Sequence, residues 1–116
     1  MKDVLQSLNK EVGVKGSLIL TKDGVVVATE IMPPLNGELV AAIVSNAIQR
    51  IISSMKGLGA QSFSRYLFNA SYGKMIFIET GDVYLVVVLD KHINIDFTML
   101  AVASAARKIK NLGSMA

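Results

Sequence analysis

The stretch that decides the fold runs from residue 37 to residue 56 and reads GELVAAIVSNAIQRIISSMK. Asn36 before it is a good helix N-cap, and Gly57 after it is a typical helix stop. The apolar spacing predicts a helix whose apolar side chains sweep an arc of about 220°, at about 100° per residue. A surface helix that packs on one sheet needs an apolar arc of only about 100°. Something more than one sheet face therefore has to cover this helix.

The remaining strip of the same helix is small and weakly charged. It holds Glu38, Ser45 and Gln49 among small residues, and no lysine. Two interpretations stay open: the helix is the buried centre of a monomer, or one of its flanks packs on a second subunit across a two-fold axis. We favour the second, because small residues permit close approach. The pattern does not indicate which flank faces the second subunit.

The neighbouring segments predict the other elements. Upstream, we expect a helix over residues 4–12, capped by Asp3, and a hairpin of strands 17–21 and 25–29, since Asp23-Gly24 between apolar runs is a strong hairpin signal. Downstream, we expect three strands joined by short turns into a meander, then a last helix that Asn94 caps and Gly113 stops. These elements span residues 62–69, 75–79, 83–89 and 95–112.

The strands over 25–29, 75–79 and 83–89 are nearly continuous apolar runs. Continuous runs indicate that both faces of a sheet are covered. The predicted fold class is therefore an α+β sandwich: a five-stranded antiparallel sheet with helices on both faces, in the order α-β-β-α-β-β-β-α. With 116 residues, we expect one domain that spans residues 1–116.

The composition excludes most chemistry. The chain is 52% hydrophobic and 18% charged, against usual shares of about 45–50% and about 25%, which indicates that part of the surface faces another protein. It has no cysteine and one histidine, which removes thiol chemistry and multi-histidine metal sites. No P-loop is present. His92 near Asp90 suggests a base and its orienter, but no nucleophile accompanies them. We expect a protein without a catalytic site, metal or cofactor.

Charge and hydropathy limit the partners and the location. The lysines are scattered, and only Arg107, Lys108 and Lys110 cluster, where they oppose the negative end of a helix dipole. Nucleic-acid binding is therefore not expected. The longest apolar run, residues 83–89, is too short to span a membrane. The first residues lack the apolar region of a signal peptide, so we expect a cytoplasmic protein without membrane insertion.

This order of elements resembles the Roadblock/dynein light chain domain family, in its prokaryotic, MglB-like single-domain branch. The resemblance covers about Val4 to Gly113. It rests on the hairpin GSLILTKDGVVVAT (16–29), the KGLG that closes the long helix (56–59), the meander SRYLFNASYGKMIFIETGDVYLVVVLD (64–90) and the last helix capped by Asn94.

The resemblance implies a homodimer that binds a Ras-like small GTPase, as a scaffold or as a stimulator of GTP hydrolysis, with no active site of its own. In this family the long helix pairs with its counterpart and the third strand pairs across the two-fold axis. The expected dimer interface is Val44, Ile48, Ile51, Ile52, Arg65, Tyr66, Leu67 and Phe68. The expected surface for the GTPase is Glu38, Ser45, Gln49 and Arg50.

Two other functions stay open. One is a structural assembly subunit of a dynein-light-chain-like or other complex, with no GTPase. The other is a PAS- or profilin-like sensor, which needs an internal cavity with convergent polar groups for a small ligand. Phe97 and Leu100 lie outside the core stripe of the last helix. They either pack on the first helix or form part of a partner site.

Overall fold

The computed structural model describes residues 1–59, 65–70 and 73–114. Three helices and five strands lie within these residues, in the predicted order. The helices are α1 (Lys2–Leu8), α2 (Gly37–Gly57) and α3 (Ile95–Ser114), and the strands are β1 (Val14–Thr21), β2 (Val26–Ile31), β3 (Arg65–Ala70), β4 (Gly73–Glu79) and β5 (Val83–Asp90).

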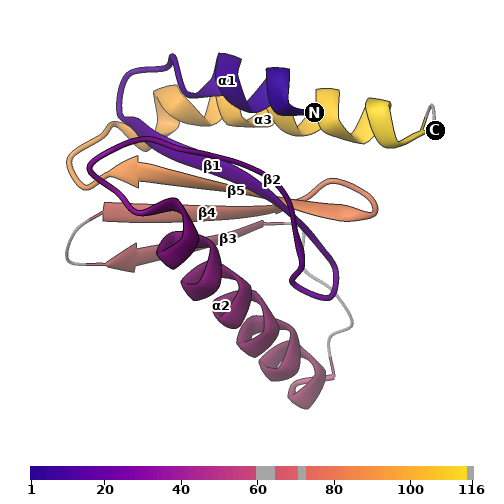
Figure 1. Ribbon diagram of the computed structural model, residues 1–116. Helices are drawn as coiled ribbons and strands as arrows, with labels where there is room; N and C mark the ends of the chain where they lie inside the picture. Colours follow the sequence, from indigo (N-terminus) through magenta and orange to yellow (C-terminus); the bar gives the residue numbers. More distant parts are fainter. Residues whose placement is uncertain (60–64, 71–72, 115–116) are drawn as a thin grey trace.

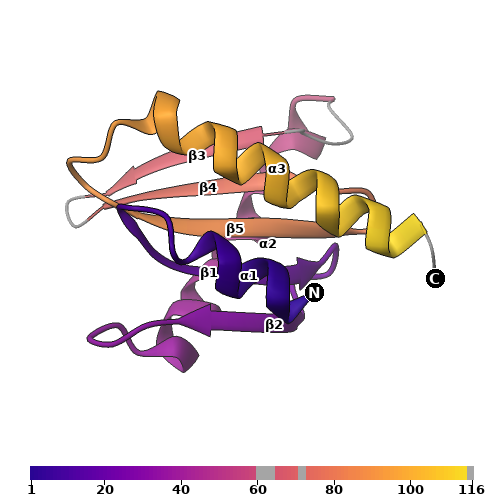
Figure 2. The ribbon, with the colours of Figure 1, turned by 90° about the horizontal axis from the view of Figure 1, so that it is seen from above.

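The strands form one sheet in the order β2-β1-β5-β4-β3, and every neighbouring pair is antiparallel. Helices α1 and α3 lie side by side on one face of the sheet, and α2 crosses the other face alone (Figure 1). Figure 2 looks down on the α1–α3 layer. This arrangement confirms the predicted fold class.

The central strands β1 and β5 are buried on both faces. Ile19, Leu85 and Val87 belong to the core beneath α1 and α3, whereas Leu18 and Val86 belong to the core beneath α2. Because successive residues of a strand point to opposite faces, covering both faces produces the unbroken apolar runs seen in the sequence.

The expectation that strand 25–29 is covered on both faces is wrong. Burial alternates along β2, and Val27 is 51% exposed. β2 is an edge strand, so one of its sides has no neighbouring strand to cover it. A register shift places Val27 in a β-bulge opposite β1, which turns its side chain outward.

The first helix is shorter than predicted. It ends at Leu8 instead of residue 12, and Asp3 lies in its first turn instead of capping it. The reason is Asn9, whose side-chain amide donates to the backbone oxygen of Glu30 at 2.7 Å and whose Oδ1 accepts from the Ser17 hydroxyl at 2.7 Å. These bonds direct the chain toward β1 and β2 instead of along the helix axis.

The last helix continues through Gly113 to Ser114, so Gly113 does not stop it. Nor do Phe97 and Leu100 pack on α1, because each is 72% exposed. Helix α1 contacts α3 through other side chains, among them Leu8 and Ala105, on a different side of α3. Residues 62–64 of the predicted third strand lie outside the described residues. No helix of the described part has the length and apolarity to cross a membrane.

We expect Asn36→Ala to lower the free energy of unfolding by about 1 kcal/mol, because the Asn36 side chain caps α2 by accepting from the Leu39 N–H at 3.1 Å. Urea denaturation measures the change. Asn46→Ala, at an exposed position inside the same helix, is the matched control and should be neutral or slightly stabilising. Equal losses for the two variants would contradict the capping role.

Candidate functional site

An apolar groove of about 340 Å³ runs between α2 and the β3–β4 edge of the sheet. Among the described residues of its lining, Arg50, Ser54 and Tyr66 carry polar side-chain groups and the others are apolar, whereas a small-ligand site has polar groups that converge on the ligand. The whole lining is Ile43, Ala47, Arg50, Ile51, Ser54, Met55, Tyr66, Phe68, Met75 and Phe77.

The walls of this groove expose large apolar side chains. Ile43 is 52% exposed on α2, and Phe68 is 47% exposed on β3. Leu67 is 45% exposed, but it points to the opposite face of the sheet from Phe68. On the groove side, Leu39, one turn before Ile43, is 59% exposed. Contiguous exposed apolar surface of this kind marks an interaction site in a soluble protein.

The floor of the groove is fixed by aromatic packing. The Tyr66 and Phe77 rings meet edge to face, with their centroids 6.3 Å apart and their planes at 73°. Phe77 itself is buried at 1% exposure. The floor of the groove is therefore formed by contacts within a single protomer and does not require a second subunit.

The structure brings part of the predicted interface together at this groove. Ile51, Tyr66 and Phe68 line it, and Arg65 and Leu67 are exposed on the same edge strand. Ile52 is half-buried and belongs to the core beneath α2, about 100° around the helix from Ile51. It is absent from the lining.

The structure corrects the prediction that Val44 and Ile48 belong to the dimer interface. Both are fully buried in the protomer, at 0% exposure, so their side chains have no surface to offer a second subunit. They lie on the half of the apolar arc that ends at Ile52, and this half faces the protein's own sheet. Leu39 and Ile43, which lie at the edge of that arc, are absent from the predicted interface.

Two residues of the predicted GTPase surface are engaged within the chain. The Ser45 hydroxyl donates to the backbone oxygen of Gly24, and the Gln49 side-chain amide donates to the backbone oxygen of Asp23 at 3.3 Å. Both bonds tie α2 to the β1–β2 turn. The flank of α2 that carries Ser45 and Gln49 is called the turn-side flank below.

The four residues predicted for the GTPase do not form one surface. Arg50 lines the groove, whereas Ser45 and Gln49 face the β1–β2 turn. Glu38 is exposed in the first turn of α2. Because Arg50 follows Gln49 by about 100° around the helix, the two side chains point to different flanks.

Side-chain contacts hold the base of the β1–β2 turn against β4 and β5. The Lys22 ammonium lies 3.0 Å from a Glu79 carboxylate oxygen and 4.5 Å from the centroid of the Tyr84 ring. Gly24 has a φ of +89° and is buried against α2. Turn and helix thus form one continuous surface next to the exposed Val25.

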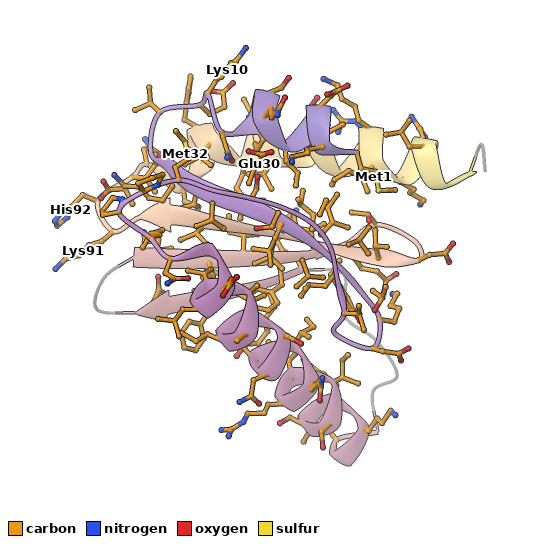
Figure 3. The ribbon with its side chains drawn as sticks, viewed as in Figure 1. Met1, Lys10, Glu30, Met32, Lys91 and His92 are labelled. Atoms are coloured by element: carbon orange, nitrogen blue, oxygen red, sulfur yellow. The ribbon has the colours of Figure 1, made fainter. Side chains whose placement is uncertain are left out.

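The Asp90–His92 pair is a structural turn. The His92 backbone N–H donates to Asp90 Oδ1 at 3.1 Å, and this bond holds the pKa of the Asp90 carboxyl below its usual value, helped by the Lys15 ammonium at 3.7 Å. Figure 3 shows the Lys91 and His92 side chains pointing away from the sheet. In residues 1–59, 65–70 and 73–114, no group of three or more His, Asp or Glu side chains is placed to hold a metal ion.

Comparison with known proteins agrees with this architecture. Residues 1–89 match the Roadblock/LC7 domain model. An uncharacterised protein of Methanocaldococcus jannaschii, MJ1340, is 32% identical over 107 residues, which cover 92% of this chain and 94% of that protein.

Solved structures show the same fold. MglB of Myxococcus xanthus superposes with a TM-score of 0.84 at 15% identity, over 99% of this chain and 95% of that one. The gliding protein MglB of Thermus thermophilus gives a TM-score of 0.78 at 19% identity, over 98% of this chain and 88% of that one.

We expect Gly24→Ala to destabilise the fold by about 1–2 kcal/mol, because the position has a positive φ and a Cβ there would lie 2.9 Å from both Ser45 Oγ and Gln49 Nε2. Thermal unfolding measures the loss. Gly57→Ala, where an added Cβ meets nothing within 4 Å, is the control and should not destabilise. A neutral Gly24→Ala would mean that the turn does not depend on α2.

Proposed function

The chain belongs to the Roadblock/LC7 domain family, and we propose that it forms a homodimer that binds a Ras-like small GTPase and regulates or positions it. The observation that carries this proposal is the exposed apolar groove between α2 and the β3–β4 edge. The GTPase follows from the family resemblance, which implies such a partner.

A second copy of the chain fits the groove in chemistry and in symmetry. In an isologous pair, the Leu39–Ile43 side of one α2 enters the groove of the other subunit and the reverse contact forms at once. The small Ala47 at the middle of this flank lets the two helices approach closely.

The open edge of β3 supports the same dimer. Within the described residues β3 pairs with β4 alone, and an unpaired edge strand with exposed apolar side chains is an aggregation hazard unless something covers it. Pairing β3 with its copy covers Leu67 and Phe68 and joins the two sheets. In this proposal each protomer is a single domain that spans residues 1–116.

The turn-side flank of α2 remains outside such a dimer. It presents Glu38, the Gln49 side chain and the β1–β2 turn with the Asp23 carboxylate, and we assign the GTPase to this surface. Ser45 acts here by holding the turn. Arg50 lies at the dimer interface in this arrangement and is therefore a poor candidate for insertion into a GTPase.

Regulation in this proposal works through contact. The chain would act on hydrolysis by stabilising the catalytic loop of the GTPase itself. Such an effect is electrostatic and positional, which is how most of phosphoryl-transfer catalysis operates.

We expect Ile43→Lys to convert the dimer into a monomer, weakening self-association by about 100-fold or more, because a lysine would be buried without a partner in the interface. Light scattering after size exclusion measures the mass. Leu100→Lys, at an apolar position of α3 that is 72% exposed, is the control and should remain dimeric. A wild-type chain that is monomeric at micromolar concentration would refute the dimer.

Capture of a Ras-like GTPase from a lysate loaded with GTP or GDP tests the partner. Binding should be lost in Glu38→Lys and kept in Leu100→Lys. If hydrolysis is accelerated, Arg50→Ala should reduce the rate by less than about tenfold, since this side chain lies away from the assigned surface. A loss near ~10³-fold, the order of an arginine finger, would contradict that assignment.

A further inference from the structure

We propose that the outer edge of β2 binds an extended polypeptide segment of a partner protein, which adds to the sheet as a further strand. β2 is the edge strand opposite β3, and Figure 2 shows it at the outer margin of the sheet. Because the sheet separates β2 from the groove and the β3 edge, this inference does not depend on the dimer.

The register shows which backbone groups of β2 face outward. The Met32 N–H donates to the Lys15 oxygen at 3.5 Å, so these two residues form a hydrogen-bonded pair of the β1–β2 ladder. Hydrogen-bonded and non-hydrogen-bonded pairs alternate in an antiparallel ladder. Ile31 and Thr29 therefore belong to non-hydrogen-bonded pairs, and their N–H and C=O groups point away from β1.

The side chains at this edge do little to block a new strand. Natural edge strands are usually protected by lysine, proline or an inward-pointing charge. From Val25 to Ile31 the chain has neither lysine nor proline, and Val25 and Val27 are 62% and 51% exposed. The bulge at Val27 protects the end of the strand next to the turn and leaves residues 28–31 in regular register.

The one charge on β2 faces inward, as an edge-protecting charge does, but it is already paired with side chains of α1. Glu30 lies 3.5 Å from the Lys2 ammonium and accepts from the Gln6 amide at 3.4 Å. Figure 3 shows Glu30 beneath α1, between that helix and the sheet. The charge therefore faces α1 and does not repel a chain that approaches the open edge.

These observations define the occupant. Alternating N–H donors and C=O acceptors on one line are satisfied by an extended backbone, which is the mode of β-strand addition. Exposed valine and threonine favour β-branched, uncharged side chains on the incoming strand. A second copy of the chain fits this edge less well. The bulge twists the edge of β2, and the edge of a second copy would have the same fixed twist. A flexible segment can adapt its backbone to the twisted edge.

The probe is a synthetic acetylated peptide of alternating threonine and valine with a lysine at each end. Titrated into ¹⁵N-labelled protein, it should shift the amide resonances of Thr29 and Ile31 and slow their hydrogen exchange. Two series of N-methylated peptides test the geometry, because only every second peptide N–H faces β2. Methylation of the odd-numbered amides and methylation of the even-numbered amides should differ: one series should not bind, and the other should bind as the unmethylated peptide does. Shifts confined to other elements, or equal binding by both methylated series, would overturn the proposal.

On the protein, Thr29→Pro removes the outward N–H without breaking a bond to β1, because proline is tolerated on an edge strand. It should weaken peptide binding about tenfold or more, while Thr29→Val should bind as the wild type does. Unchanged binding by Thr29→Pro would also overturn the proposal. The proposal would also be overturned if the chain associates with itself and Thr29→Pro abolishes that association, because a second copy of the chain would then occupy this edge.

Discussion

The packing of one helix against a five-stranded sheet constrains most of this structure. Strands lie about 4.8 Å apart, so five of them span about 20 Å, whereas a helix with its side chains is about 10 Å wide. On one face, α1 and α3 share the coverage. On the other face, α2 docks alone through Val44 and Ile48, and the strip of sheet toward β3 is left open as the groove.

Much of the fold could be predicted because its signals are local. The Asp23-Gly24 turn, the Asn36 cap and the doubly covered β5 are each encoded in a few consecutive residues. The end of α1 could not be predicted, because it depends on Asn9 bonding to Ser17 and Glu30, which a separate part of the chain supplies.

The site was harder to predict for the same reason. Periodicity gives the width of the apolar arc on α2 but not which part of it meets the protein's own sheet. The predicted interface therefore includes Val44 and Ile48, which are buried in the protomer, and omits Leu39 and Ile43, which are exposed. Ser45 and Gln49 look like a free polar strip, yet their partners are the backbone oxygens of a turn far away in sequence. Phe97 and Leu100 are exposed, and nothing in the described residues covers them.

The central claim is that a second copy of the chain fills the groove of the first. An isotope-filtered NOE experiment on a dimer mixed from labelled and unlabelled chains tests it most directly, because it records contacts between subunits alone. The account predicts intermolecular NOEs from the Ile43 and Ile51 methyl groups, and from the Phe68 ring, to the other subunit. Intermolecular NOEs confined to α3 or to β2, or none at all, would contradict it.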